Sequence, residues 1–161
     1  MNRSDLLTGE NITEDNLNQD ESLIYQINHK EEIETVIASL EENDSAMVLE
    51  TDGGYLWKFQ YGSVEVFVQL TGDNEDDLLT VWSVVLPLPA KNEPELMKKL
   101  LEMNWSGTFE TCFSIFDNQV VISSQRTIAD LYPSEISRII TLVASIANEN
   151  DHALITEYGN R

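Results

Sequence analysis

The side chains best suited to chemistry in this chain are two histidines, one cysteine and a pair of serines, and they lie far apart. His29 and His152 stand near the ends of predicted helices, where they are expected at the surface with no partner for acid–base work. Cys112 lies within a predicted strand, away from the base or helix N-terminus that activates a thiol, and is expected to be buried or half-buried. Ser123 and Ser124 lack the G-x-S-x-G frame of a nucleophile. The chain is therefore predicted not to be an enzyme and to carry no cofactor.

A run of acidic residues, 73–77, is the one segment with a composition that suits a metal ion. An EF-hand loop needs alternating ligands, a glycine at its sixth position and a glutamate at its twelfth. This segment instead places Asp77, Leu78 and Leu79 where the loop should turn. A solvated acidic loop is favoured, and a small-ligand or metal-responsive sensor that uses residues 73–77 is kept as the alternative function.

The elements that must position these residues follow a pattern typical of an α+β domain. Apolar residues at helical spacing predict three helices, at 29–42, from 92 to about 103, and from 133 to about 158. Alternating apolar residues between turn signals predict an antiparallel sheet of about five strands, with the overall order α-β-β-β-α-β-β-α. The predicted strands cover 55–61, 64–70, 78–88, 108–116 and 119–126, and a short extended run at 46–50 precedes them.

Length and charge restrict the class of protein. The chain has 161 residues, which suits one domain at 29–161 behind an acidic, flexible tail at 1–28. Nine basic and 29 acidic residues leave a net charge of −20, which argues against nucleic acid and anionic membranes as partners. A single cysteine, a polar N-terminus unlike a signal peptide and the absence of a long apolar run predict a cytoplasmic protein.

The strand at 78–88 is apolar on both faces, which raises the question of what covers each side of the sheet. Alternation places Trp82, Val84 and Leu86 on one side of it, and Trp57 and Phe59 are expected beside them. Two interpretations remain open, because either the first and last helices or another protein chain could cover this face.

Several runs of residues, together with the order of elements, resemble the YbjN family of bacterial proteins. The runs are 54–59 with 64–68, 84–87 before the middle helix, 113–126, and 128–131 with the helix start at 133–136. The resemblance covers about residues 30–158 and implies a fold like that of type III secretion chaperones, in a commonly dimeric adaptor or regulator without catalytic residues. Members of this family in cyanobacteria resemble assembly factors for the carboxysome shell, so an assembly role is one expectation.

The leading hypothesis is a non-catalytic protein-binding module, a chaperone-like adaptor or regulator that holds a client protein or peptide segment. The acidic surface favours a basic client, and a homodimer is compatible with the resemblance. The residues expected to contact the client are Trp57, Phe59, Trp82, Val84 and Leu86.

Overall fold

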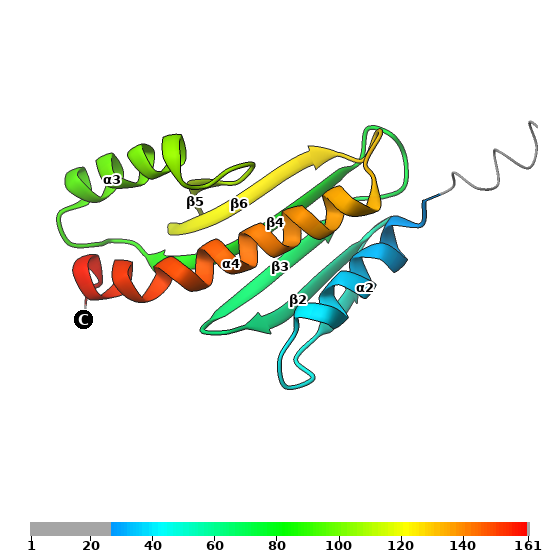
Figure 1. The fold of residues 1–161 in the computed structure, drawn as a ribbon, viewed down its shortest axis with the longest axis horizontal. Coiled ribbons are helices and arrows are strands. Elements are labelled where there is room, and N and C mark those ends of the chain that lie inside the picture. The colour runs from blue at the N-terminus through cyan, green and yellow to red at the C-terminus, as the bar shows by residue number, and fades with distance from the viewer. Residues whose placement is uncertain (1–26, 161) are drawn as a thin grey trace, which may run out of the picture.

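The computed structural model describes residues 27–160, which form six strands and three helices (Figure 1). The predicted tail at 1–28 lies outside the described residues except for Ile27 and Asn28. In chain order the elements are α2 (His29–Leu40), β1 (Met47–Glu50), β2 (Tyr55–Tyr61), β3 (Val64–Leu70), β4 (Leu78–Pro87), α3 (Glu93–Ser106), β5 (Cys112–Phe116), β6 (Gln119–Thr127) and α4 (Pro133–Tyr158).

The strands form one antiparallel sheet in the order β1-β2-β3-β4-β6-β5. The α+β class and the antiparallel sheet are confirmed, but the predicted count of about five strands was too low. The additional strand is β1, which pairs with β2 from Met47 opposite Lys58 to Glu50 opposite Tyr55. All four β1 side chains are exposed, so the strand lacks the alternation by which half-buried strands are recognised.

Turn residues set the ends of the strands. Gly54, directly before β2, lies so close to β3 that a Cβ atom there would be 2.0 Å from the backbone oxygen of Leu70, which explains the glycine. Asp117 and Asn118 both have positive φ, which confirms the predicted tight hairpin between β5 and β6. The predicted start of β5 at residue 108 was wrong, because residues 108–111 form a turn that the Thr111 hydroxyl closes by donating to the carbonyl of Thr108.

The helices begin and end near the predicted positions. The Asn28 side chain accepts a hydrogen bond from the Glu31 amide at 3.2 Å and so caps α2, which ends two residues before the predicted position. Pro133 opens α4 in its first turn, as predicted. Asn92 was expected to cap α3, but it adopts a left-handed conformation and its side chain donates to Glu95 instead of accepting a backbone N–H.

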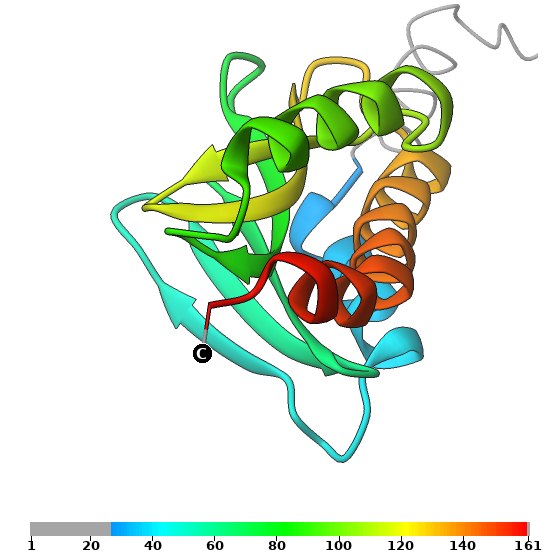
Figure 2. The same ribbon diagram turned by 90° about the vertical axis from the view of Figure 1, so that its left-hand side faces the viewer.

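All three helices contribute to one hydrophobic core on a single side of the sheet (Figure 2). The long helix α4 crosses this face and buries ten residues of its length, with α2 packed beside it over the β2 end (Figure 1). Helix α3 lies along the β5 edge and turns Leu96 and Leu100 into the same core. No helix among residues 27–160 is long and apolar enough to span a membrane. The helices of the described residues therefore cover one face of the sheet and leave the other face without a helical cover.

Phe59 tests this assignment of the core, because its ring is fully buried beneath the helices. Phe59→Ala should lower the free energy of unfolding by about 3–5 kcal/mol, the cost of a large buried cavity. Urea denaturation followed by circular dichroism measures this change. Leu101→Ala, on an exposed position of α3, is the control and should stay within about 0.5 kcal/mol of the wild type. Equal effects of the two substitutions would contradict the assignment.

Candidate functional site

The strand register separates the side chains of the sheet into a covered face and an open face. Trp57, Val68 and Val81 are opposite one another on neighbouring strands and are buried. The Trp57 indole donates to the Glu34 carboxylate of α2 at 3.3 Å, which places this row under the helices. The next residues along the strands, including Phe67 and Trp82, point to the opposite side. We call that side the open face, because no helix of residues 27–160 covers it (Figure 2).

Three aromatic rings from three strands form a cluster at the centre of the open face. The rings of Phe67 and Trp82 stack with 5.2 Å between their centroids and an angle of 10° between their planes. Phe116 meets Trp82 edge-on, with 6.0 Å between centroids and an angle of 73°. These are the favourable geometries for aromatic pairs. The rings shield one another in part, so the side chains of Phe67 and Trp82 are half-buried, while that of Phe116 is exposed.

Apolar side chains extend the open face on both sides of this cluster. Met47 and Leu49 of β1 are 64% and 62% exposed, and they lie opposite Lys58 and Leu56 of β2 on this face. Toward β6, Val84 is half-buried opposite Val121, which is buried outside the main core. Apolar side chains exposed on several strands of one sheet face are typical of a protein-interaction site.

The structure does not bring the five predicted contact residues together. Trp57, Phe59 and Leu86 are buried under the helices, and only Trp82 and Val84 lie on the open face. Leu86 departs from the predicted alternation because the pairing of β4 with β6 is irregular between Val84 and Leu86, which returns Leu86 to the covered face. Trp57 and Phe59 pair with the inward residues of β3, a relation that depends on register and not on either strand alone.

A known protein family matches most of the chain. A model of the YbjN family, described as "Putative bacterial sensory transduction regulator", matches residues 29–156. The chain belongs to the YbjN family. The resemblance inferred from the sequence is thereby confirmed. Among solved structures, this YbjN-family chain is similar to a chain in "Crystal Structure of the ExsC-ExsE Complex", with 16% identity, a TM-score of 0.46, and coverage of 71% of this chain and 79% of that one. No curated protein matches it significantly.

The individual reactive residues of this YbjN-family protein remain separate in space. His152 is exposed on α4, as expected. Cys112, expected to be at least half-buried, is exposed because it begins the edge strand β5. Ser123 and Ser124 lie in β6, where their hydroxyls bond to Ser114 and to the Glu110 carbonyl. None of these residues is paired with a base within the part of the chain that the structure describes.

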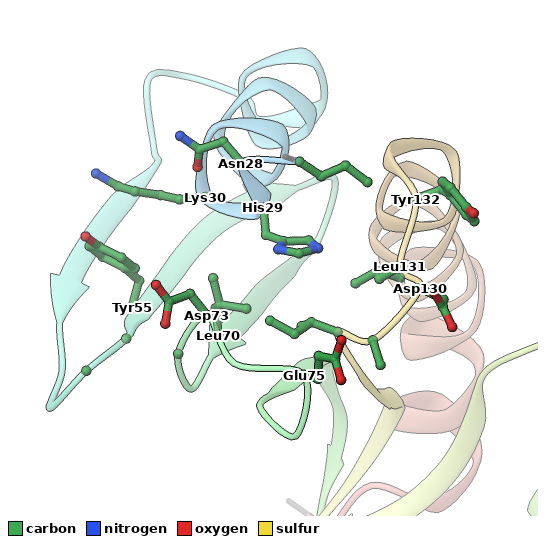
Figure 3. A pocket seen from close by; sticks show the side chains of 16 residues that line it. Asn28, His29, Lys30, Tyr55, Leu70, Asp73, Glu75, Asp130, Leu131 and Tyr132 are labelled. Atoms are coloured by element: carbon green, nitrogen blue, oxygen red, sulfur yellow. The ribbon is translucent and has the colours of Figure 1, made fainter. Parts of the chain in front are cut away.

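His29 was expected at the surface but is half-buried in the wall of a hollow of about 1030 Å³. Figure 3 shows its ring at the centre of this hollow, with Asp73, Glu75 and Asp130 around the rim. These carboxylates are exposed, and the buried Nε2 of His29 has no hydrogen-bond partner among residues 27–160. No local pattern in the sequence marks this hollow, because it forms where segments distant along the chain meet. The described residues provide no histidine–carboxylate pair there for catalysis.

The acidic loop before β4 is closed by one of its own carboxylates. The Asp77 oxygens accept hydrogen bonds from the Asn74 amide at 2.9 Å and the Thr71 hydroxyl at 2.8 Å. These bonds, the Asn74 amide first, lower the pKa of Asp77 below its ordinary value of 3.8. No group of three or more ligating side chains suited to a metal ion occurs in residues 27–160. The loop therefore offers no ligand cluster for the metal-sensor alternative.

Asp77→Asn tests this role of the carboxylate in the loop. A lowered pKa in the folded state means that the ionised group stabilises the fold above the unfolded pKa, and that this contribution disappears as pH falls through the folded pKa. The variant should therefore melt below the wild type at about pH 7, and the difference should shrink toward about pH 3. Thermal unfolding at several pH values measures both. Asp76→Asn, in the same loop, is the control, and a difference independent of pH would refute the assignment.

Proposed function

We propose that this YbjN-family protein is a non-catalytic protein-binding module, a chaperone-like adaptor or regulator that holds a client protein through the open face of its sheet. The observation that carries the proposal is the aromatic cluster of Phe67, Trp82 and Phe116, which lies on a face without a helical cover in residues 27–160. Aromatic residues surrounded by other contacts contribute most of the affinity at protein interfaces.

The polar residues of the open face are already paired with one another, which suits a surface that loses its water when a partner binds. Lys58 and Glu65 form an ion pair at 3.3 Å with both side chains partly exposed, so neither charge is buried before binding. Thr80 and Gln125 are bonded to each other at 2.9 Å on the same face. Such groups form the polar rim around an apolar centre that is common in protein interfaces.

The charge of the chain supports a basic client. The net charge of −20 attracts positively charged partners over a distance and repels acidic ones. Long-range attraction raises the rate of encounter, while apolar contacts at Trp82 and Val84 would limit the rate of dissociation. Either a regulator or an assembly factor can use a surface of this kind, because both hold another protein without changing it chemically.

Trp82→Asp is the substitution that tests the proposal. It places a charge in the centre of the cluster, so recovery of a bound client from a lysate of the native cells should fall by at least about tenfold, in keeping with the contribution of an aromatic hot spot. Affinity purification and quantitative mass spectrometry measure the recovery, with circular dichroism as the check of folding.

Trp105→Asp is the matched control, because it makes the same exchange at an exposed position of α3 outside the open face. Its client should be recovered as with the wild type. A folded Trp82→Asp protein that retains every partner would remove the open face from the proposal. A wild-type protein that recovers nothing above background would contradict protein binding as the function.

A further inference from the structure

The free edge of β1 is the part of the sheet that is best prepared to accept another strand. β1 is the terminal strand of the sheet, and one of its edges pairs with β2. Its apolar residues Met47, Val48 and Leu49 are 64%, 55% and 62% exposed. Exposed apolar edge strands readily pair with additional chains, and proteins usually protect them with lysine, proline or a covering segment. β1 contains neither lysine nor proline.

The hydrogen bonds around β1 show which of its backbone groups face outward. Thr51 and Gly54 exchange backbone hydrogen bonds at 2.9 and 3.4 Å, so they form a hydrogen-bonded pair of the ladder. Such pairs alternate in an antiparallel ladder, so the backbone N–H and C=O groups of Leu49 also point toward β2. The N–H and C=O groups of Val48 and Glu50 point to the free edge. The Ala46 amide has the same outward direction, and it donates to the Glu41 carboxylate at 2.6 Å.

The other edge of the sheet is closed by a side chain at one of its outward positions. At β5, the Phe113 amide donates to Asn104 Oδ1 of α3 at 2.7 Å, and Asn104 Nδ2 donates to the Phe113 carbonyl at 3.2 Å. The amide side chain of Asn104 thus takes the place of a neighbouring strand. At β1 only Ala46 has a comparable side-chain partner among the described residues. Within residues 27–160, two successive outward positions, Val48 and Glu50, have no backbone partner.

The charge around β1 identifies the chemistry of the incoming strand. Residues 41–52 include five acidic side chains and no lysine or arginine. The acidic residues are Glu41, Glu42, Asp44, Glu50 and Asp52. A second copy of this chain would bring the same five charges to the same edge, which like-charge repulsion disfavours. A segment with basic residues is complementary to it.

We propose that an extended client segment of alternating apolar and basic residues adds to the sheet along the free edge of β1. Its residues opposite Leu49 and Met47 lie on the open face, where apolar side chains extend the surface. Its residues opposite Glu50 and Val48 lie on the other side, where a basic side chain pairs with Glu50 and its methylene stem covers Val48. The inference rests on the proposed function, since it states how the client is held.

A decapeptide of alternating lysine and valine, blocked at both ends and labelled with a fluorophore, is the probe. Fluorescence anisotropy with the full chain should show saturable binding, and the glutamate–valine counterpart should not bind. Methylation of the backbone nitrogens of the lysines, which donate to β1 in the proposed register, should weaken binding at least about tenfold. Methylation at the valines, whose N–H groups point away, should leave it unchanged. Equal binding of both methylated peptides would overturn the proposal, because charge attraction alone would then explain it.

Val48→Pro provides the test on the protein. Proline removes an outward donor that β2 does not use, so the β1–β2 ladder keeps its hydrogen bonds while peptide binding falls at least about tenfold. Val48→Ala retains the N–H and should bind as the wild type does. Unchanged binding by a folded Val48→Pro protein would refute the edge site, as would a dimer in sedimentation that this substitution dissociates. A client lost with Trp82→Asp but kept with Val48→Pro would refute this inference alone, and the proposed function would stand.

Discussion

The packing of α4 across one face of the sheet is the interaction on which the other features depend. This 26-residue helix buries ten side chains, among them Ile136, Ile140 and Val143, against the strands and α2. Helices α2 and α3 pack on the same side, so the apolar surface removed from water is concentrated in one core. The consequence is a sheet with one buried face and one face that the described helices leave open.

The open face requires a different form of stabilisation from the core. Its aromatic rings cover each other by stacking and by edge contact, and not by burial beneath a helix. Alternation along the central strand supplies Val81 and Ser83 to the core and Trp82 and Val84 to the open face. The same strand therefore links the stability of the fold to the surface that we propose for client binding.

The two edges of the sheet differ in which outward backbone groups are hydrogen-bonded by a side chain. Asn104 closes the β5 edge at Phe113, because α3 brings its side chain there. At β1 only the Ala46 amide is bonded by a side chain, that of Glu41, and the outward groups of Val48 and Glu50 have no partner in the described part of the chain. The five acidic residues of the segment 41–52 keep identical chains apart and favour a basic strand, while the nearby Lys58 is already paired with Glu65. Met47 and Leu49 lie on the same face as the aromatic cluster, so a strand added to β1 would extend that face.

The sequence by itself determined the helices, most strands, the tight hairpin at Asp117 and Asn118, and membership of the family, because these depend on short-range periodicity, turn chemistry and local runs. It placed Trp82 and Val84 correctly on one side of β4 but added Leu86, since the irregular pairing after Val84 is invisible to alternation. Only the tertiary structure decided that Trp57 and Phe59 face the helices, because strand register relates residues on different strands. The hollow at His29 likewise forms where segments distant along the chain meet, which no local pattern encodes. Strand β1 was anticipated only as a short extended run at 46–50, because its exposed side chains show no alternation.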